Sequence, residues 1–575
     1  MPFTRPKNLR DLLGAKAARY IPRLLPAVAV VAVVCVVGTV AASGLLGGGA
    51  ATPSAKPSMV MTPTPWAKAA AASPTSTSTP TPTAAPPAPF PIAVIARYDY
   101  APTSIGQAAL TAALAAGKIT LPCELEGLSY GATTLVISAA TPCLPADQIV
   151  AAVHKSADLM ALLPPGLVTP SVKVLAVGDA DLFGGPHSRS QAYMLYGAVA
   201  TPEDWTAYDA SAVRTLISTG DTCPDRGVSY EADYMKKGWS WVLDGGTVHY
   251  RGTKPDPYGW GWQVPIIARN GDSGQLAALI SDNDVSANDF ECPMIKDWVQ
   301  HNDGKVFNID PKVAPLLAGT GGLKVVTLGS NHITDAGRSG ILETIDYLDA
   351  AGIKHTGAGA TLADALAPAV VDVRGVKFAF VGWDDITGSA AATNTNPGVA
   401  PLTTDNACNS IKAAKKVADI VIAMPQWGWP EYHANITSDQ EKLRALFYSC
   451  GADGILGSGT HWASWTSVTQ GANGPQFAIG SHGNFLFDQS WSRQTMEGVI
   501  VEATFYGKKL VQFRLHPYVV VQGAQPNLVD PATDGAYVLH QVWSVSDIRL
   551  VGGTAIPAVS SAKPTASATA AASRS

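Results

Sequence analysis

Four apolar runs in the second half of the chain each end abruptly in polar residues, and this pattern restricts the possible folds most. The runs lie within RTLISTGD (214–221), GLKVVTLGSNH (322–332), DIVIAMPQWG (419–428) and ADGILGSGTH (452–461). An apolar run bounded by turn residues is typical of a strand that is buried on both faces of a parallel sheet. In open α/β sheets, sites form at the carboxyl ends of such strands. The pattern therefore predicts an α/β fold with a site at that edge.

The segments between these runs, and the region before them, continue the alternation of strands and helices. In residues 213–545, DAGRSGILETIDYLDAAGI (335–353) has helical spacing, and VVDVRGVKFAFVGWDD (370–385) predicts a hairpin with Arg-Gly at its turn. Residues 91–212 are predicted to form a smaller α/β domain, for which we expect an accessory or binding role. Its predicted strands are 92–98, 133–140 and 172–179, and its predicted helices are 104–118 and 146–163.

The N-terminal region has the pattern of a membrane anchor. Residues 1–23 carry six basic side chains against the single acid Asp11, and residues 24–46 carry no charge. This length is enough to cross a bilayer, and the basic flank predicts a cytoplasmic N-terminus. A cleaved signal peptide ending near TVAAS (39–43) is the alternative. The Pro-, Thr- and Ala-rich segment 47–90 predicts a spacer, and residues 546–575 predict a disordered tail. We therefore expect a single-pass membrane protein with extracytoplasmic domains.

Charge and cysteine content narrow the partners and the compartment. Only 15% of the residues are charged and the net charge is −5, so the chain has no basic surface typical of nucleic-acid binding. Six cysteines outside the apolar N-terminal run form an even set in a compartment that we expect to be oxidising. Spacing does not determine connectivity. We expect nearest-neighbour disulfides: Cys123 with Cys143, Cys223 with Cys292, and Cys408 with Cys450.

Polar side chains at successive strand ends are candidates for a metal site. They are Asp221, Glu291, Asn331, Gln426 and His461, and His332 follows Asn331 directly. Carboxylate, amide and imidazole groups together suit one or two divalent cations. Each signal is weak alone, because Asp179 follows an equally good strand in VKVLAVGD (172–179). The ordered series is what favours metal binding.

The segments that carry these residues resemble the CapA-type capsule (poly-γ-glutamate) synthesis proteins, a branch of the calcineurin-like metallophosphoesterase superfamily. The resemblance covers residues 213 to about 545. GDTCPDRGV (220–228) resembles the family's opening Gly-Asp segment with its trailing Arg226, and DFECP (289–293) resembles Asn-Leu-Glu with Asp289 replacing Asn. Residues 329–359 give the longest match, and IGSHGNFLFDQ (479–489) resembles the later Gly-Asn segment that contains Asn484.

This resemblance implies roles for individual residues. Asp221 and Glu291 would be metal ligands with Glu291 bridging, Asn331 would bind a second ion, and His332 would act as a proton donor or oxyanion partner. Two departures remove imidazole groups: Gln426 replaces a histidine, and Gly459 replaces the first of two histidines of which His461 is the second. The remaining set predicts one oxygen-preferring ion such as Mn²⁺ or Mg²⁺, and a second only with help.

Other residues could support such a site. His433 and His482 are candidate replacement ligands, although local hydrogen bonding explains each equally well. Arg226 and Asn484 are expected to contact substrate. An aromatic cluster could stack on sugar rings, or it could be core and rim packing. The cluster consists of Trp427, Trp429, Tyr432, Trp462 and Trp465, of which Trp427 and Tyr432 are our candidate substrate contacts.

The resemblance also implies a function and a fold. We expect a calcineurin-like α/β sandwich preceded by the smaller α/β domain. The protein would act on a capsule or other cell-envelope polymer, or on its precursor, in synthesis, attachment or trimming. Its chemistry would be metal-assisted hydrolysis or transfer at a phosphoryl or related ester centre. The alternative is a catalytically degenerate scaffold that binds the polymer through the same cleft.

Overall fold

The computed structural model describes residues 89–552, except residues 140, 202, 301 and 387–389. All of the described residues belong to one compact unit. The predicted membrane helix at 24–46, and nearly all of the spacer at 47–90, lie outside the described residues. Within the part that is described, no helix is both long enough and apolar enough to cross a membrane.

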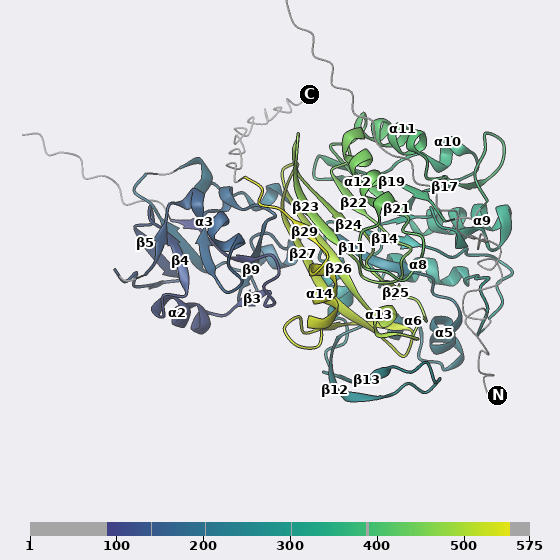
Figure 1. Ribbon diagram of the computed structural model, residues 1–575, viewed down its shortest axis with the longest axis horizontal. Helices are drawn as coiled ribbons and strands as arrows, with labels where there is room; N and C mark the ends of the chain where they lie inside the picture. The colour runs from purple at the N-terminus through teal and green to yellow at the C-terminus, as the bar shows by residue number, and fades with distance from the viewer. Residues whose placement is uncertain (1–88, 140, 202, 301, 387–389, 553–575) are drawn as a thin grey trace, which may run out of the picture. The chain divides into compact units, whose positions relative to one another are not determined.

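Two large sheets dominate residues 213–552 (Figure 1). The ten-stranded sheet runs β13-β12-β28-β27-β26-β11-β14-β15-β16, and β25 pairs with β11. Its strands are β11 (Val213–Thr222), β12 (Thr247–Pro255), β13 (Gln263–Arg269), β14 (Val285–Phe290), β15 (Val325–Thr327), β16 (Lys354–Thr356), β25 (Asn484–Leu486), β26 (Glu497–Tyr506), β27 (Lys509–Val521) and β28 (Gln525–Val529).

The second large sheet has seven strands in the order β18-β19-β21-β22-β24-β23-β29. They are β18 (Ala369–Val373), β19 (Val376–Asp384), β21 (Ile420–Gln426), β22 (Gly454–Leu456), β23 (Thr466–Gly471), β24 (Gly474–Ile479) and β29 (Asp547–Ile548). A two-stranded sheet pairs β17 (Ala358–Gly359) with β20 (Gly398–Val399). In both large sheets the strands that carry candidate site residues run parallel.

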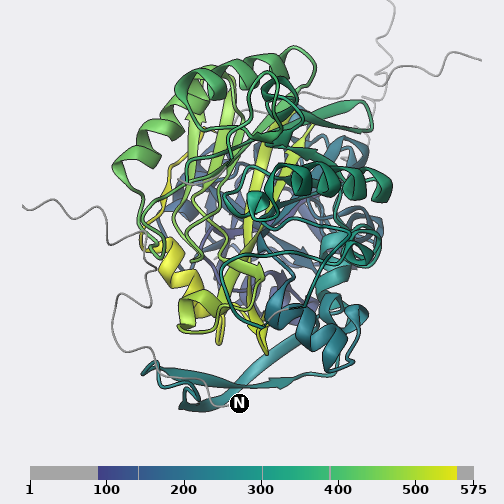
Figure 2. The same ribbon diagram turned by 90° about the vertical axis from the view of Figure 1, so that its right-hand side faces the viewer.

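The two large sheets pack face to face. Leu216 of β11 lies in a core with Phe378 of β19 and Ile422 of β21, whereas its neighbour Ile217 faces the helices outside. In Figure 2 the strands lie between α11 and α12, drawn in green, and the teal helices around α9. The helices of this region are α5 (Arg226–Ser229), α6 (Trp239–Leu243), α7 (Gln275–Ser281), α8 (Ala314–Ala318), α9 (Gly337–Ala351), α10 (Leu362–Ala365), α11 (Thr404–Lys415), α12 (Ser438–Cys450), α13 (Arg493–Met496) and α14 (Ala536–Trp543).

Residues 89–212 form two smaller sheets with short helices. The six-stranded sheet contains β3 (Ser104–Ile105), β9 (Val172–Val177), β2 (Ala93–Arg97), β8 (Met160–Leu163), β4 (Ile119–Pro122) and β7 (Cys143–Leu144). The four-stranded sheet contains β1 (Phe90–Pro91), β10 (Leu195–Ala198), β5 (Gly127–Tyr130) and β6 (Thr133–Thr134). The helices are α2 (Gln107–Ala115), α3 (Ala146–His154) and α4 (Pro186–Ser190).

A buried ion pair and a shared core join residues 89–212 to the ten-stranded sheet. Arg514 of β27 contacts Asp181 at 2.5 Å and Glu502 of β26 at 2.7 Å, and all three side chains are buried. Tyr506 and Val511, from β26 and β27, belong to the same hydrophobic cluster as residues of β2, α3 and β9. The two regions therefore stabilise each other.

Most of the predicted elements that carry the site are confirmed. The strands expected at 92–98, 172–179 and 214–221 form β2, β9 and β11, and the helix expected at 335–353 forms α9. The hairpin is β18 and β19, with Arg374 at φ 50° and Gly375 at φ 82° in its turn. Positive φ at both central residues matches the twist of the adjoining strands.

Three predicted elements are wrong. Of the strand expected at 133–140, only β6 forms. The last residues of the helix expected at 146–163 instead form β8, because their apolar side chains are buried where the segment pairs with β2. A short apolar run fits either a strand or a buried helix. The segment expected to be a tail from residue 546 begins with β29, which pairs with β23.

Candidate metal centre

The predicted site residues converge from the carboxyl ends of both large sheets. Asp221 is the next-to-last residue of β11. Glu291 directly follows β14, and Asn331 and His332 follow β15. From the seven-stranded sheet, Gln426 is the last residue of β21, and His461 follows β22. Parallel strands place their carboxyl ends at one edge, so the sandwich brings the two sets of polar groups together.

Asp221, Glu291 and His461 form the centre of this site. Each offers one ligand atom, and these atoms all lie within 4.8 Å of one another. His461 Nδ1 lies 3.1 Å from Asp221 Oδ2 and 2.8 Å from Asn484 Oδ1. Burial alone would lower the pKa of His461, but its hydrogen bond to Asp221 and the charge of Asp221 raise it. The geometry suits a bound cation, because imidazole and carboxylate groups are both common ligands.

The carboxylates of the site are buried with little opposite charge. Asp221 and Glu291 are fully buried and Asp289 is 4% exposed, and apart from His461, which contacts Asp221, no basic side chain among the described residues pairs with their oxygens. Burial raises the pKa of both Asp289 and Glu291, and the charge of Asp221 raises each further. Buried charge is costly unless it is paired or binds a metal. A divalent cation would compensate these groups, so the residues fit one.

Backbone strain is concentrated at the same place. Arg226, Tyr432 and His461 have positive φ angles of 43°, 66° and 57°, and none of them is glycine. Such conformations cost about 1–3 kcal/mol each and persist where the surrounding structure imposes them, often at functional sites. The Tyr432 ring stacks on the His461 ring with centroids 5.6 Å apart, which restricts the orientation of the imidazole.

The two amide residues contact each other across the sandwich. Gln426 Nε2 donates to Asn331 Oδ1 at 2.7 Å. Gln426 Oε1 is buried and accepts no hydrogen bond from any described residue. Amide oxygens bind hard cations, so the two side chains are candidates for further ligands of a metal ion.

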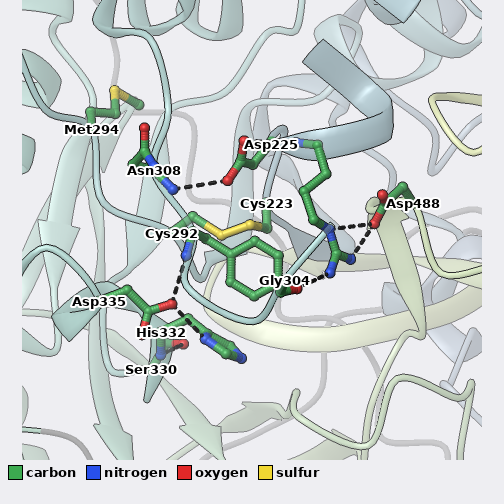
Figure 3. Close-up of a disulfide and its surroundings, with 12 residues drawn as sticks. Cys223, Asp225, Cys292, Met294, Gly304, Asn308, Ser330, His332, Asp335 and Asp488 are labelled. Atoms are coloured by element: carbon green, nitrogen blue, oxygen red, sulfur yellow. Dashed lines mark hydrogen bonds and ion pairs between the residues drawn. A yellow bond between two sulfur atoms is a disulfide. The ribbon is translucent and has the colours of Figure 1, made fainter. Parts of the chain in front are cut away.

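His332 and Arg226 are both partly exposed, and Figure 3 shows His332 next to Asp335. His332 Nδ1 is 2.9 Å from Asp335 Oδ2, and its ring contacts Phe307 edge to face at 4.6 Å. The Arg226 guanidinium lies 4.5 Å from the same Phe307 ring and pairs with Asp488. The aromatic ring therefore separates the imidazole from the guanidinium and holds both in place.

A disulfide connects the two ligand-bearing strands. Cys223 and Cys292 are bonded, with Cα atoms 5.1 Å apart, and they follow Asp221 by two residues and Glu291 by one (Figure 3). All three nearest-neighbour pairings that the sequence favoured are confirmed. Because this bond lies so near both ligands, it limits how far the two strand ends can separate.

Two expected substrate contacts need correction. The Trp427 ring is fully buried against Phe447, and its Nε1 donates to Gly480 O at 2.8 Å, so it cannot act as an exposed stacking surface. Asn484 is also fully buried. Its amide donates to Thr495 O while its oxygen contacts His461, so it orients a candidate ligand rather than reaching substrate.

The two candidate replacement histidines have local partners instead. Both ring nitrogens of His433 lie within hydrogen-bond distance of backbone carbonyls, those of Asn435 and Gly428. His482 Nδ1 contacts Gly457 O at 3.2 Å, and burial lowers its pKa to about 4. Neither belongs to the cluster of Asp221, Glu291 and His461 within the described part of the chain.

The structure adds residues that the sequence did not assign to the site. Asp335 contacts His332, Asp488 pairs with Arg226, and Asp289 lies among the buried carboxylates. Only Asp289 had a signal in the sequence, since it precedes Glu291 by two positions and alternate strand residues share a face. The partners of His332 and Arg226 come together only in the tertiary structure. Asp179, the equally well placed aspartate that follows β9, is exposed and lies outside the site.

Gly459 occupies a position where a histidine cannot fit. Its φ is 91°, and a Cβ there would lie 2.9 Å from Gln426 Cγ and 3.2 Å from Trp427 O. The two positions where this chain lacks the family's histidines, Gln426 and Gly459, are therefore neighbours, because the Gln426 side chain fills the volume beside Gly459. We expect Gly459→His to lower the melting temperature and to bind no more Zn²⁺ than the unchanged protein, as measured by thermal unfolding and elemental analysis.

Gly507→His is the matched control for this substitution. Gly507 has φ 61°, and no atom lies within 4 Å of the Cβ position, so the variant carries the backbone penalty without the clash. The backbone penalty is about 1 kcal/mol or slightly more. Gly459→His should therefore be clearly less stable than Gly507→His. An increase in zinc binding by Gly459→His would show that the position still accepts a ligand.

Comparison with known proteins gives related sequences for the larger region. Residues 215–489 match the family described as bacterial capsule synthesis protein PGA_cap. The capsule biosynthesis protein CapA of Bacillus anthracis is 28% identical over 293 residues, which are 48% of this chain and 69% of that protein. The PGA biosynthesis protein CapA of Bacillus subtilis (strain 168) is 33% identical over 180 residues, 31% of this chain and 46% of that protein.

Solved structures give only distant matches. The calcineurin-like phosphoesterase YfkN from Bacillus subtilis is 13% identical with a TM-score of 0.30, and the match covers 57% of this chain and 97% of that one. At this similarity it carries no argument.

Proposed function

Because this chain is a CapA-type protein, related through residues 215–489 to the bacterial capsule synthesis family, we propose that it acts in making or attaching a capsule or other cell-envelope polymer. The proposed chemistry is metal-assisted hydrolysis or transfer at a phosphoryl or related ester centre. The observation that carries this proposal is the set of buried carboxylates beside His461, which pairs with no basic side chain among the described residues except that histidine.

The donor set supports a cation in the site. Asp221, Glu291 and His461 would hold it, and the oxygens of Asn331 and Gln426 are candidates for further ligands. A bound divalent ion would supply positive charge for the oxygens of a phosphoryl or ester group. Asn484 and Tyr432 contact His461 and fix the orientation of its ring.

His332 is the proposed proton donor. Asp335 holds its Nδ1, and Nε2 makes no hydrogen bond to any described residue, so Nε2 is the atom that would give a proton to a leaving oxygen. Arg226 lies beside it with one edge paired to Asp488, and its side chain is 14% exposed. Its charge would attract an anionic substrate to this side of the site.

The proposed location is the outer face of a membrane, with residues 24–46 as a single anchor. Those residues lie outside the described part of the structure. Three disulfides among the described residues support an oxidising compartment. The proposed partner is a cell-envelope polymer or its precursor.

A catalytically degenerate scaffold remains the second candidate, and the loss of two imidazoles at Gln426 and Gly459 favours it. The burial of Trp427 counts against the scaffold, because this ring was expected to form part of the polymer-binding surface and cannot stack on a polymer. The cost of keeping Asp221, Asp289 and Glu291 buried also counts against a site that no longer binds metal.

Metal analysis and hydrolysis assays test the proposed function. We expect purified protein that contains residues 89–552 to bind Mn²⁺. It should hydrolyse chromogenic phosphomonoesters or phosphodiesters only when metal is present. His332→Ala should keep its metal but lose roughly 100-fold in kcat, because one positioned proton donor contributes at least that much. Elemental analysis and initial rates measure the two effects separately.

The exposed His249 on β12 provides the control, and His249→Ala should match the unchanged protein in both measurements. Absence of bound metal, together with no activity that His332→Ala lowers, would favour the scaffold instead.

A further inference from the structure

The side chain of Asp289 faces the metal centre from the end of β14. The neighbouring Asn288 points to the other side, where its amide donates to Thr219 Oγ1 at 2.6 Å and to Thr222 Oγ1 at 3.0 Å. Successive residues of a strand alternate between faces, so Asp289 and Glu291 share the opposite face. Asp289 contacts the side chain of Glu291 and lies close enough to Asp221 for the charge of Asp221 to act on it, which agrees with this placement.

No positive group among the described residues compensates Asp289. Its side chain is 4% exposed, none of the ion pairs of the described residues includes it, and its side-chain contacts are the hydroxyl of Ser458 and the carboxyl group of Glu291, neither of which is positively charged. Its polar neighbour Ser458 directs its own hydroxyl to Pro425 O at 3.5 Å. A buried carboxylate in this position is costly unless a cation binds beside it.

Gln426 provides a second, independent observation from the opposite sheet. Its Oε1 is buried and accepts no hydrogen bond from the described residues, while its Nε2 donates to Asn331. Gln426 pairs with Ser458 through a parallel β-bridge, and Ser458 is also a neighbour of Asp289. Ser458 is therefore a neighbour both of Asp289, from the ten-stranded sheet, and of Gln426, from the seven-stranded sheet. Gly459, which has no side chain, directly follows Ser458 in the sequence.

We propose that Asp289 is a metal ligand and that, with Gln426, it replaces the imidazole groups that this chain lacks. The inference rests on the proposed metal site and specifies its chemistry. Asp289 lies outside the cluster of Asp221, Glu291 and His461 whose ligand atoms are within 4.8 Å of one another, but it contacts Glu291 at the edge of that cluster. As an added ligand it would bring the donors to three carboxylates, amide oxygens and the single imidazole of His461. Oxygen donors favour hard cations such as Mn²⁺ and Mg²⁺, whereas imidazole-rich sites suit Zn²⁺. The site is therefore selective for a hard divalent cation over zinc.

The test compares Asp289→Asn with the unchanged protein in calorimetric titrations of the metal-free form with MnCl₂ and, separately, ZnCl₂. Asn keeps the shape of the side chain and removes its charge. We expect the affinity for Mn²⁺ to fall at least about tenfold and the affinity for Zn²⁺ to fall less. Asp179→Asn, at the exposed aspartate that follows β9, should leave both affinities unchanged.

The melting temperature of the metal-free variant shows whether Asp289→Asn folds, and it should equal or exceed that of the unchanged protein. If the variant does not fold, Asp289→Ala, which also removes the carboxylate, provides the same comparison of Mn²⁺ with Zn²⁺. Wild-type affinity for Mn²⁺ in a folded variant without this carboxylate would overturn this inference alone. A wild-type protein that binds no metal would overturn the proposed function as well.

Discussion

Replacing Glu291 by Gln is expected to abolish metal binding and to reduce hydrolysis to the uncatalysed background. Glu291 is fully buried, and its ligand atom lies within 4.8 Å of those of Asp221 and His461. Residues that only orient a metal ligand typically contribute 10–100-fold to affinity, so loss of a direct ligand should cost at least about 100-fold. Calorimetric titration with Mn²⁺ and initial-rate measurements would record both losses.

The same substitution should stabilise the metal-free protein. Three carboxylates are buried together, and Glu291→Gln removes one of the mutually repelling charges while keeping the size of the side chain. Adding metal at 100 times its dissociation constant should stabilise the unchanged protein by about 2.7 kcal/mol and the variant by almost nothing. Thermal unfolding with and without Mn²⁺ would therefore show the order of stability reversing.

Glu497→Gln is the control for a buried glutamate outside the site. Glu497 pairs with Arg493 and Tyr250, and burial raises its pKa to about 7. This variant should retain normal metal binding and activity. If Glu291→Gln bound Mn²⁺ as tightly as the unchanged protein, Glu291 would not be a ligand.

Replacing Arg514 by Met is expected to give the largest loss of stability. Arg514 is buried between Asp181 and Glu502, with N–O distances of 2.5 and 2.7 Å. Removing the guanidinium leaves two carboxylates buried without it, and breaking such a pair typically costs about 3–5 kcal/mol. Urea unfolding of the metal-free protein would measure the difference in the free energy of unfolding.

Acid unfolding gives a second readout of the same change. Burial alone would raise the pKa of Glu502, but the charge of Arg514 and the hydrogen bond from His516 hold it at about 2. A depressed carboxyl pKa contributes stability above its unfolded value, and this contribution is lost as the pH falls toward 2. Arg514→Met should therefore reduce the part of the stability that the unchanged protein loses between about pH 4 and pH 2.

Arg549→Met is the matched control, because Arg549 forms an exposed pair with Asp547 at 2.8 Å. Exposed pairs contribute about 0–1 kcal/mol. If the two arginine variants were equally stable, the buried pair would not hold residues 89–212 against the ten-stranded sheet.

The sequence was most informative where local pattern and burial agree. The strand ending at Asp221 and the hairpin with Arg374 and Gly375 follow from apolar runs bounded by turn residues, and both form as predicted. The helix expected over Met160–Leu163 is wrong, because a four-residue apolar run is too short to show either helical or strand periodicity. Its pairing with β2 decides the outcome, and that partner is far away in sequence.

In the candidate site, too, the sequence predicts some features and does not indicate others. Residue types at strand ends predicted which side chains gather there, and the structure brings Asp221, Glu291 and His461 together. The burial of Trp427 and the contact of Asn484 with His461 depend on how the seven-stranded sheet packs against α12 and the ten-stranded sheet. The reason for glycine at position 459 depends on the Gln426 side chain, and sequence alone does not indicate that contact.

The core shared by Tyr506, Val511 and the strands of residues 89–212 limits which parts of this protein recombination between genes can exchange. The last described residues also return to that region, because Val551 N donates to Ser171 Oγ at 2.8 Å. A recombination event near residue 212 would separate two halves of one apolar interior and leave Arg514 without Asp181. We therefore expect exchange of this N-terminal region between genes to succeed only when β26, β27 and the segment that follows β29 are exchanged with it.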